Sequence, residues 1–229
     1  MTVLASLLLA DSRLPTGGHA HSGGVEAAVE RGLLRDEADL TLFLAARLRG
    51  TGPMVAAVAA TGCSLAADTA PVGWSRWDAA VSARTPSAAT REASRAQGTA
   101  LLRTARRIWP SAALEALSHT GRPHHALVLG AVVAATGDGA GAAALLALHH
   151  LLGGACAAAV RLLGLDPIAV AAVQVRASRS AEQTAAAAAL VAREAVARHD
   201  TRLLPSTGTP LPEVLAELHA RSEVALFAS

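Results

Sequence analysis

The apolar residues of this chain carry very few aromatic rings. Hydrophobic residues make up 52% of the 229 residues, whereas aromatic residues make up 2%. The apolar surface therefore comes mainly from Ala, Leu and Val, which suit the close packing of helix against helix better than the faces of a sheet. We expect an all-α fold, and the length suits a single domain that comprises residues 1–229.

Proline residues divide the chain into short helical segments. Several follow a residue that can cap a helix, as in Asp166-Pro167, and the first turn of a helix accepts proline well. Apolar and polar residues alternate with a helical period between these points. We expect a bundle of roughly ten short helices, near residues 24–34, 37–49, 53–67, 73–83, 86–108, 111–118, 123–135, 140–164, 167–175, 180–199 and 211–219.

Two segments near the ends of the chain depart from this pattern. Residues 1–24 form an N-terminal segment with a Gly-rich end, and residues 200–212 hold three prolines among polar residues. We interpret residues 200–212 as a hinge and residues 213–229 as a mobile C-terminal tail, because too little chain follows for a second domain. The apolar Leu226 and Phe227 of this tail must be buried, either on the chain's own core or on a partner.

The charged residues exclude several classes of function. The chain contains no lysine, so all 20 basic residues are arginines. This composition excludes an ordinary Walker A phosphate loop and a lysine Schiff base with pyridoxal phosphate. The charges are interspersed, and few rings are present to stack on bases. We expect no cofactor and no nucleic acid partner.

Three features of the sequence indicate the cellular compartment of the protein. The apolar stretch 139–165 contains His149, His150 and Arg161, which favours a buried bundle helix over a membrane span. The N-terminal apolar run is short and lacks the basic residues of a signal peptide. Cys63 and Cys156 have no nearby cysteine and suit buried thiols in a reducing compartment. We expect a cytoplasmic protein without a membrane partner.

Metal and catalytic chemistry have little support in the sequence. His19 and His21 could face one side of an extended loop, but only Glu26 is near enough to be a third ligand, so we expect no metal site. The adjacent pairs His124-His125 and His149-His150 diverge on helices. We interpret the first pair as surface or capping residues and the second as core residues. No G-x-S-x-G motif is present, and we expect no enzymatic activity.

A family resemblance is visible in the N-terminal segment. Residues 9–26 read LADSRLPTGGHAHSGGVE. They resemble the signature D-S-x-L-P-x-G-G-x-x-x-S-x-G-[LV]-E of the UreF family of urease accessory proteins. The similarity continues through Thr90-Arg91-Glu92-Ala93-Ser94, Gly98, Leu101-Leu102, His125-Ala126-Leu127-Val128 and Gly130 to the terminal Leu226-Phe227-Ala228-Ser229.

This resemblance implies a nickel-insertion chaperone that is not an enzyme. It would be a helical homodimer that binds the UreD-type protein, also called UreH, on apo-urease and recruits the UreG-type GTPase. An alternative is a GTPase-regulating protein that supplies an arginine to UreG in trans, with Arg13, Arg31 and Arg35 as candidates.

The signature and the tail supply the candidate partner-binding residues. From the residues alone, the Gly-rich loop is either a contact surface or a connection between helices. The candidates are Pro15, Gly17, Gly18, His21, Ser22, Gly24, Glu26, Leu226 and Phe227.

Overall fold

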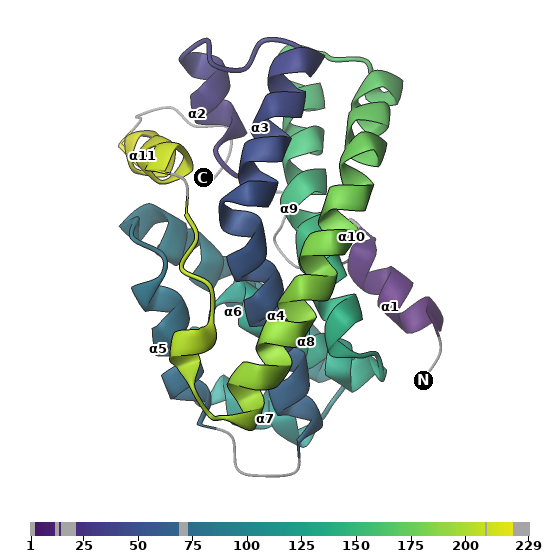
Figure 1. The fold of residues 1–229 in the computed structure, drawn as a ribbon, viewed down its shortest axis with the longest axis vertical. Coiled ribbons are helices and arrows are strands. Elements are labelled where there is room, and N and C mark those ends of the chain that lie inside the picture. The colour runs from purple at the N-terminus through teal and green to yellow at the C-terminus, as the bar shows by residue number, and fades with distance from the viewer. Residues whose placement is uncertain (1–2, 12–13, 15–21, 69–72, 209, 222–229) are drawn as a thin grey trace.

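A computed structural model describes residues 3–11, 14, 22–68, 73–208 and 210–221 (Figure 1). These residues form helices and connecting turns without a strand, which confirms the all-α expectation. The elements are α1 (Val3–Ala10), α2 (Val25–Glu30), α3 (Glu37–Arg49), α4 (Thr51–Ala67), α5 (Trp74–Ala83), α6 (Ala88–Ile108), α7 (Ala112–Ser118), α8 (His125–Thr136), α9 (Ala140–Leu163), α10 (Pro167–Ala197), the 3-10 helix η2 (Thr201–Leu203) and α11 (Pro210–His219).

Helix α4 lies at the centre of the bundle and packs against α8, α9 and α10. Glycines permit the close approach of α4 to α8. A Cβ atom on Gly130 would lie 1.9 Å from the carbonyl oxygen of Ala59, and one on Gly62 would lie 2.3 Å from that of Leu127. These two helices therefore touch backbone to backbone, as the Ala-rich composition predicted in general terms.

Most helices begin near the proline and capping residues from which their starts were predicted. Asp166 caps α10 by accepting hydrogen bonds from the amides of Ile168 and Ala169, with Pro167 in the first turn. Ser87 and Ser111 cap α6 and α7 in the same manner. Capping side chains satisfy amides that have no partner inside the helix.

The structure differs from the predicted helices at three places. The expected helices 167–175 and 180–199 are one continuous helix of 31 residues. The polar residues between them are exposed, and Ser178 donates its hydroxyl to the carbonyl of Val175, at 2.7 Å, within the helix. Helix α2 ends at Glu30 instead of residue 34, and Val3–Ala10 forms a helix that was not predicted.

The apolar helix α9 belongs to the bundle. Among the described residues it is the one helix that is long and apolar enough to cross a membrane, and half of its most apolar stretch is buried. Helices α3 and α4 would pass the same test only as a joint span, but they are bent by 50° where they meet. Ala143, Leu148 and Leu152 of α9 face the core, in agreement with the predicted bundle helix.

Candidate functional site

The described end of the N-terminal signature forms a turn that leads into α2. Ser22 is buried, and its hydroxyl accepts a hydrogen bond from the amide of Glu26, at 3.3 Å. Gly23 and Gly24 both have positive φ, 61° and 88°, a conformation that side chains with a Cβ atom rarely adopt. Glycine is therefore favoured at residues 23 and 24, because the backbone enters α2 through two residues with positive φ.

Arg47 of α3 holds this turn. Its Nη1 atom donates a hydrogen bond to the carbonyl oxygen of Gly23, and its guanidinium lies 5.8 Å from the centre of the Phe43 ring. Burial lowers the pKa of Arg47 to about 10, so the group remains charged at neutral pH. A Cβ atom on Gly23 would lie 2.6 Å from Nη1, so a larger residue there would also displace the guanidinium.

Glu26 joins the signature to the C-terminal helix. Its Oε2 atom lies 3.4 Å from Nε2 of His219 in α11, and both side chains are almost fully buried. The sequence assigned Glu26 to partner binding. The structure places its carboxylate inside the protein, where it positions α11.

Two carboxylates hold α11 against the start of α6. Glu213 accepts a hydrogen bond from the amide of Ser87, at 2.8 Å, and Glu217 accepts bonds from the Ser87 hydroxyl and the Ala89 amide, at 2.6 and 3.0 Å. The hydrogen bond from Ser87 holds the pKa of Glu217 below its usual value. Carboxylates are favoured at a helix N-terminus, because its amides carry partial positive charge.

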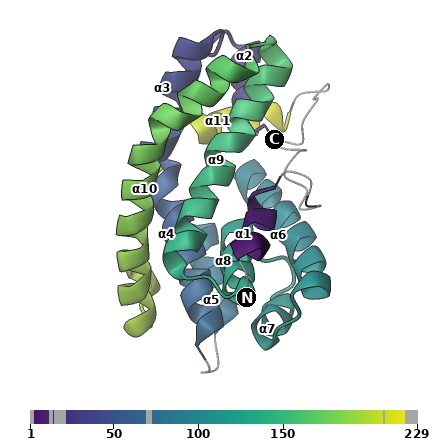
Figure 2. The ribbon, with the colours of Figure 1, turned by 90° about the vertical axis from the view of Figure 1, so that its right-hand side faces the viewer.

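The outer face of α11 is apolar. Leu211, Val214 and Leu218 are 53%, 51% and 38% exposed, and their spacing places them along one edge of the helix. Helix α11 lies across the molecule between α2 and α6, as Figures 1 and 2 show. We call the outer edge of α11, together with the largely buried turn at residues 22–24 and the helix α2 that packs against α11, the terminal surface. It combines segments from both ends of the chain.

The candidate residues divide between the described and the undescribed parts of the chain. Ser22, Gly24 and Glu26 are all buried beside the terminal surface, so these residues act on its shape. The others lie outside the described residues: Pro15, Gly17, Gly18, His21, Leu226 and Phe227.

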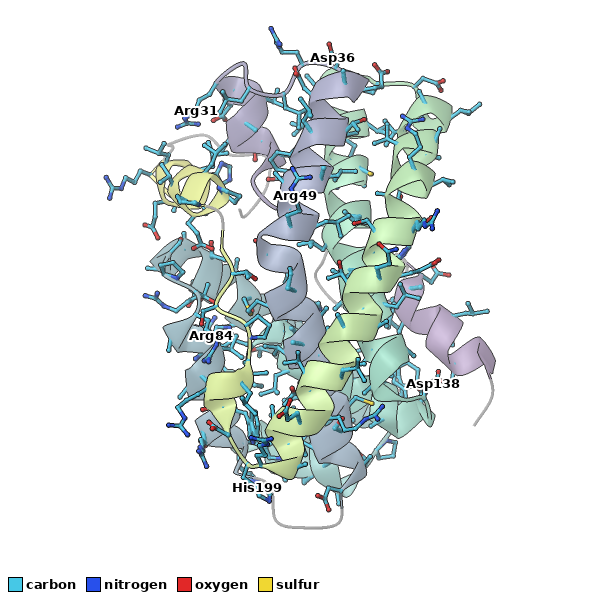
Figure 3. The ribbon with its side chains drawn as sticks, viewed as in Figure 1. Arg31, Asp36, Arg49, Arg84, Asp138 and His199 are labelled. Carbon is cyan, nitrogen blue, oxygen red and sulfur yellow. The ribbon has the colours of Figure 1, made fainter. Side chains whose placement is uncertain are left out.

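The segment predicted as a hinge is attached to the bundle at its start. Arg84 donates hydrogen bonds to the carbonyls of Thr201 and Leu204, at 2.7 and 3.2 Å, and Leu204 is buried. Figure 3 shows Arg84 beside the segment that leads to α11. A hinge within residues 200–212 stays a prediction, and it would have to bend beyond Leu204.

A buried polar network, which the sequence did not reveal, surrounds His124. The ring lies 2.9 Å from the Ser82 hydroxyl through Nε2 and 3.0 Å from the Ser94 hydroxyl through Nδ1. Asp78 accepts a hydrogen bond from the His124 amide and forms an ion pair with Arg95, at 2.8 and 2.9 Å. The sequence predicted a surface or capping position for His124. It does precede α8 at the cap position, but its side chain is fully buried.

The contact between Ser82 and His124 is the one feature that this network shares with the nucleophile and general base of a serine hydrolase. The second ring nitrogen of His124 meets a serine, and Asp78 bonds to the backbone amide instead of the imidazole. The histidine also has no exposed surface. A serine hydrolase needs an accessible nucleophile and an acid that orients the base, so the network serves to join α5, α6 and α8.

The other histidine pair was half correctly predicted. Nε2 of His150 donates a hydrogen bond to the carbonyl of Leu9, at 2.8 Å, whereas His149 is exposed. Burial lowers the pKa of His150 to about 4. His125 of α8 lies near His150, with 6.0 Å between ring centres. No group of three or more His, Cys, Asp or Glu residues in the described chain could hold a metal ion.

The cysteines are buried thiols, as predicted. Cys63 and Cys156 are 2% and 4% exposed and unpaired within the described residues. Burial raises the pKa of each thiol to about 11, which keeps both protonated at neutral pH.

Two of the three arginines considered for a GTPase-regulating role have partners within the chain. Arg31 donates to the carbonyl of Ala27 and forms an ion pair with Glu30. Arg35 forms an ion pair with Asp39, at 3.0 Å. The third candidate, Arg13, lies outside the described residues.

The comparisons with known proteins identify the family. The UreF family model matches residues 34–178, which include most of the bundle. The chain belongs to the UreF family.

Similarity to individual UreF proteins extends over the whole chain. The urease accessory protein UreF of Mycolicibacterium vanbaalenii is 44% identical over 232 aligned residues, and that of Mycobacterium marinum is 43% identical over 230. The UreF protein of Mycobacterium tuberculosis is 41% identical over 232 residues. Each alignment covers 100% of both chains, so the signature and the tail lie within it.

Proposed function

We propose that this protein is a non-enzymatic urease accessory protein, a nickel-insertion chaperone that bridges the UreD/UreH-type protein on apo-urease and the UreG-type GTPase. The observation that carries the proposal is the full-length similarity to proteins named urease accessory protein UreF. The free buried thiols of Cys63 and Cys156 support a cytoplasmic location.

The terminal surface supports a role in binding the UreD/UreH-type partner. Exposed apolar residues at helical spacing, such as Leu211 and Val214, are typical of helices that bind a protein partner. The tail that carries Leu226 and Phe227 follows directly from α11. The buried contacts of Glu26 with His219 would hold the helix in position, so that little order has to be gained on binding.

A homodimer is part of this proposal. Leu42 of α3 and Ile168 of α10 are 68% and 80% exposed. Large apolar side chains at this exposure favour association with a second copy or with a partner. Light scattering of the purified protein should give twice the mass of one chain.

The proposal is tested by reconstitution from purified proteins. The UreD/UreH-type protein and the UreG-type GTPase of the same organism are mixed with and without this chain, and the complexes are separated by size-exclusion chromatography. We expect one complex that contains all three proteins, and no complex of the two partners alone. A stable complex of the two partners without this chain, or failure of this chain to bind either one, would overturn the bridging role.

A further inference from the structure

An Arg-rich groove lies between α6 and α7, away from the terminal surface. It has a volume of about 520 Å³, with the buried Leu102 at its base. Arg103, Arg106 and Arg107 of α6 line it, and Glu115 of α7 faces them. The volume falls in the range of sites that accommodate several side chains or a ligand of similar size.

The charge of this groove is only partly neutralised. Nε and Nη2 of Arg106 both donate to one oxygen of Glu115, at 3.0 and 2.6 Å. Arg103 and Arg107 form no ion pair with any described residue. They are four residues apart on one helix, so their Cβ atoms are separated by about 6 Å. Two neighbouring guanidinium groups are thus available to an anionic ligand.

The position of these arginines is not explained by the helix dipole alone. Arg106 and Arg107 occupy the last turn of α6, where positive charge is favoured. Arg103 lies one turn earlier and faces the same groove. The three residues therefore share a cavity as well as a helix end.

We propose that the groove binds an acidic segment of a partner protein, with carboxylates paired to Arg103 and Arg107. Glu115 pairs with Arg106, so one guanidinium of the groove already binds a carboxylate. Ile108, 48% exposed, follows Arg107 and offers an apolar contact beside the charges. Arginine beside an apolar residue is a common composition at protein interfaces.

Nucleic acid fits this groove less well than an acidic protein segment. The nearest aromatic residue along the chain, Trp109, is buried and offers no face for stacking on a base.

The groove is also well placed for a protein that binds two partners. Helix α6 rises about 1.5 Å per residue, so Arg103 lies about 24 Å along its axis from Ser87, where α11 is attached. Figure 2 shows α7 and α11 at different heights along the bundle. One partner at the terminal surface would leave the groove free for another. The choice of partner proteins in the test below rests on the proposed function.

The test uses the full-length protein and the double variant Arg103→Glu/Arg107→Glu. The first probe is a short fluorescent peptide of alternating Glu and Leu residues, and single-stranded DNA is the comparison. The second set of probes is the UreD/UreH-type protein, the UreG-type GTPase and apo-urease, each purified. Arg176→Glu/Arg179→Glu on α10 is the matched control, because both residues are exposed and form no ion pair with a described residue.

We expect the unaltered protein to bind the acidic peptide, with affinity that falls between about 50 and 300 mM salt. The groove variant should lose about tenfold or more in affinity for the peptide and for one of the three proteins, whereas the control variant should bind both normally. The variant Arg103→Lys/Arg107→Lys keeps the positive charges but lacks the planar guanidinium that binds a carboxylate through two hydrogen bonds. Its loss of affinity should be intermediate.

Three results would overturn the proposal. The first is the absence of peptide binding by the unaltered protein, and the second is an equal loss in the control variant. The third is tight binding of single-stranded DNA that depends on Arg103 and Arg107 when peptide binding does not. This result would make the groove a nucleic acid site. If peptide binding depends on the groove but no urease protein binds this chain at all, the proposed function fails and the carboxylate site stands.

Discussion

Nε2 of His219 lies 3.4 Å from Oε2 of Glu26, in a contact that is almost fully buried and joins the two ends of the chain. Glu26, the last residue of the signature, lies in the first turn of α2, and His219 ends the last described helix. The signature and the C-terminal helix are therefore parts of one structural unit. A change at either residue should alter the surface that the other supports.

Replacement of Glu26 by Ala should destabilise the protein by about 3 kcal/mol, because it leaves a buried polar partner without its contact. Urea denaturation measures this loss, and hydrogen exchange should show faster exchange in α11 than elsewhere. Glu194→Ala, which removes an exposed ion pair with Arg198, is the control and should cost less than about 1 kcal/mol. Equal stability of the two variants would contradict the structural role of Glu26.

Gly98 and Gly130 should not tolerate a methyl group. A Cβ atom would lie 2.0 Å from the carbonyl oxygen of Pro123 at the first position and 1.9 Å from that of Ala59 at the second. Gly98→Ala and Gly130→Ala should each cost about 2 kcal/mol or more, because helix backbones must move apart. Thermal or urea denaturation provides the measurement.

Gly154 is the matched control for these two substitutions. It lies inside α9 and is exposed, and a Cβ atom there would meet nothing within 4 Å. Gly154→Ala should therefore stabilise the protein by up to about 1 kcal/mol through helix propensity. Stability losses of similar size at all three positions would show that close packing is not the cause.

Folding stability should fall as pH is lowered from about 6.5 to 4. Burial lowers the pKa of His124 to about 4, an effect that the Asp78 carboxylate opposes and the nearby Arg95 and Arg91 increase. Because the folded pKa lies below the unfolded value, the unfolded state binds more protons in this range. The loss attributable to His124 is roughly 3 kcal/mol and levels off below pH 4.

Denaturation midpoints measured across this pH range, together with an NMR titration of the His124 ring, test the prediction. The variant His124→Asn should be less stable at neutral pH and should show a weaker dependence on pH in the same window. Titration of the His124 ring near the ordinary histidine value of about 6.5 would contradict its buried, neutral state.

Much of the fold was predictable because its signals are local. Proline and capping residues marked most helix starts, and the scarcity of aromatic residues indicated helix packing. The break expected at residues 176–179 was wrong because exposed polar residues are compatible with a helix, and no sequence signal separates them from a loop. Local propensity also missed α1.

The site was less predictable, since its contacts join distant segments. His124 looked like a surface residue because its partners, Asp78, Ser82 and Ser94, come from two other helices. Glu26 was found through the family signature, but nothing in the sequence pairs it with His219. The Arg-rich groove likewise depends on the position of α7, which no periodic pattern specifies.

Removal of residues 221–229 should leave helicity and thermal melting nearly unchanged. It should weaken binding of the UreD/UreH-type protein by about tenfold or more, because the apolar Leu226 and Phe227 would be lost from the interface. Circular dichroism and a binding assay measure the two effects. Unfolding of the truncated protein would show that the tail belongs to the core, and normal binding would show that it is dispensable.

As a nickel-insertion chaperone, this chain should be required for nickel insertion into urease. The direct measurement is the nickel content and activity of urease purified from cells that express the urease operon with and without the gene for this chain, at limiting nickel. We expect urease without this chain to be nickel-poor and inactive, and both properties to return when the gene is restored. Urease with full nickel content and activity in its absence would contradict this role.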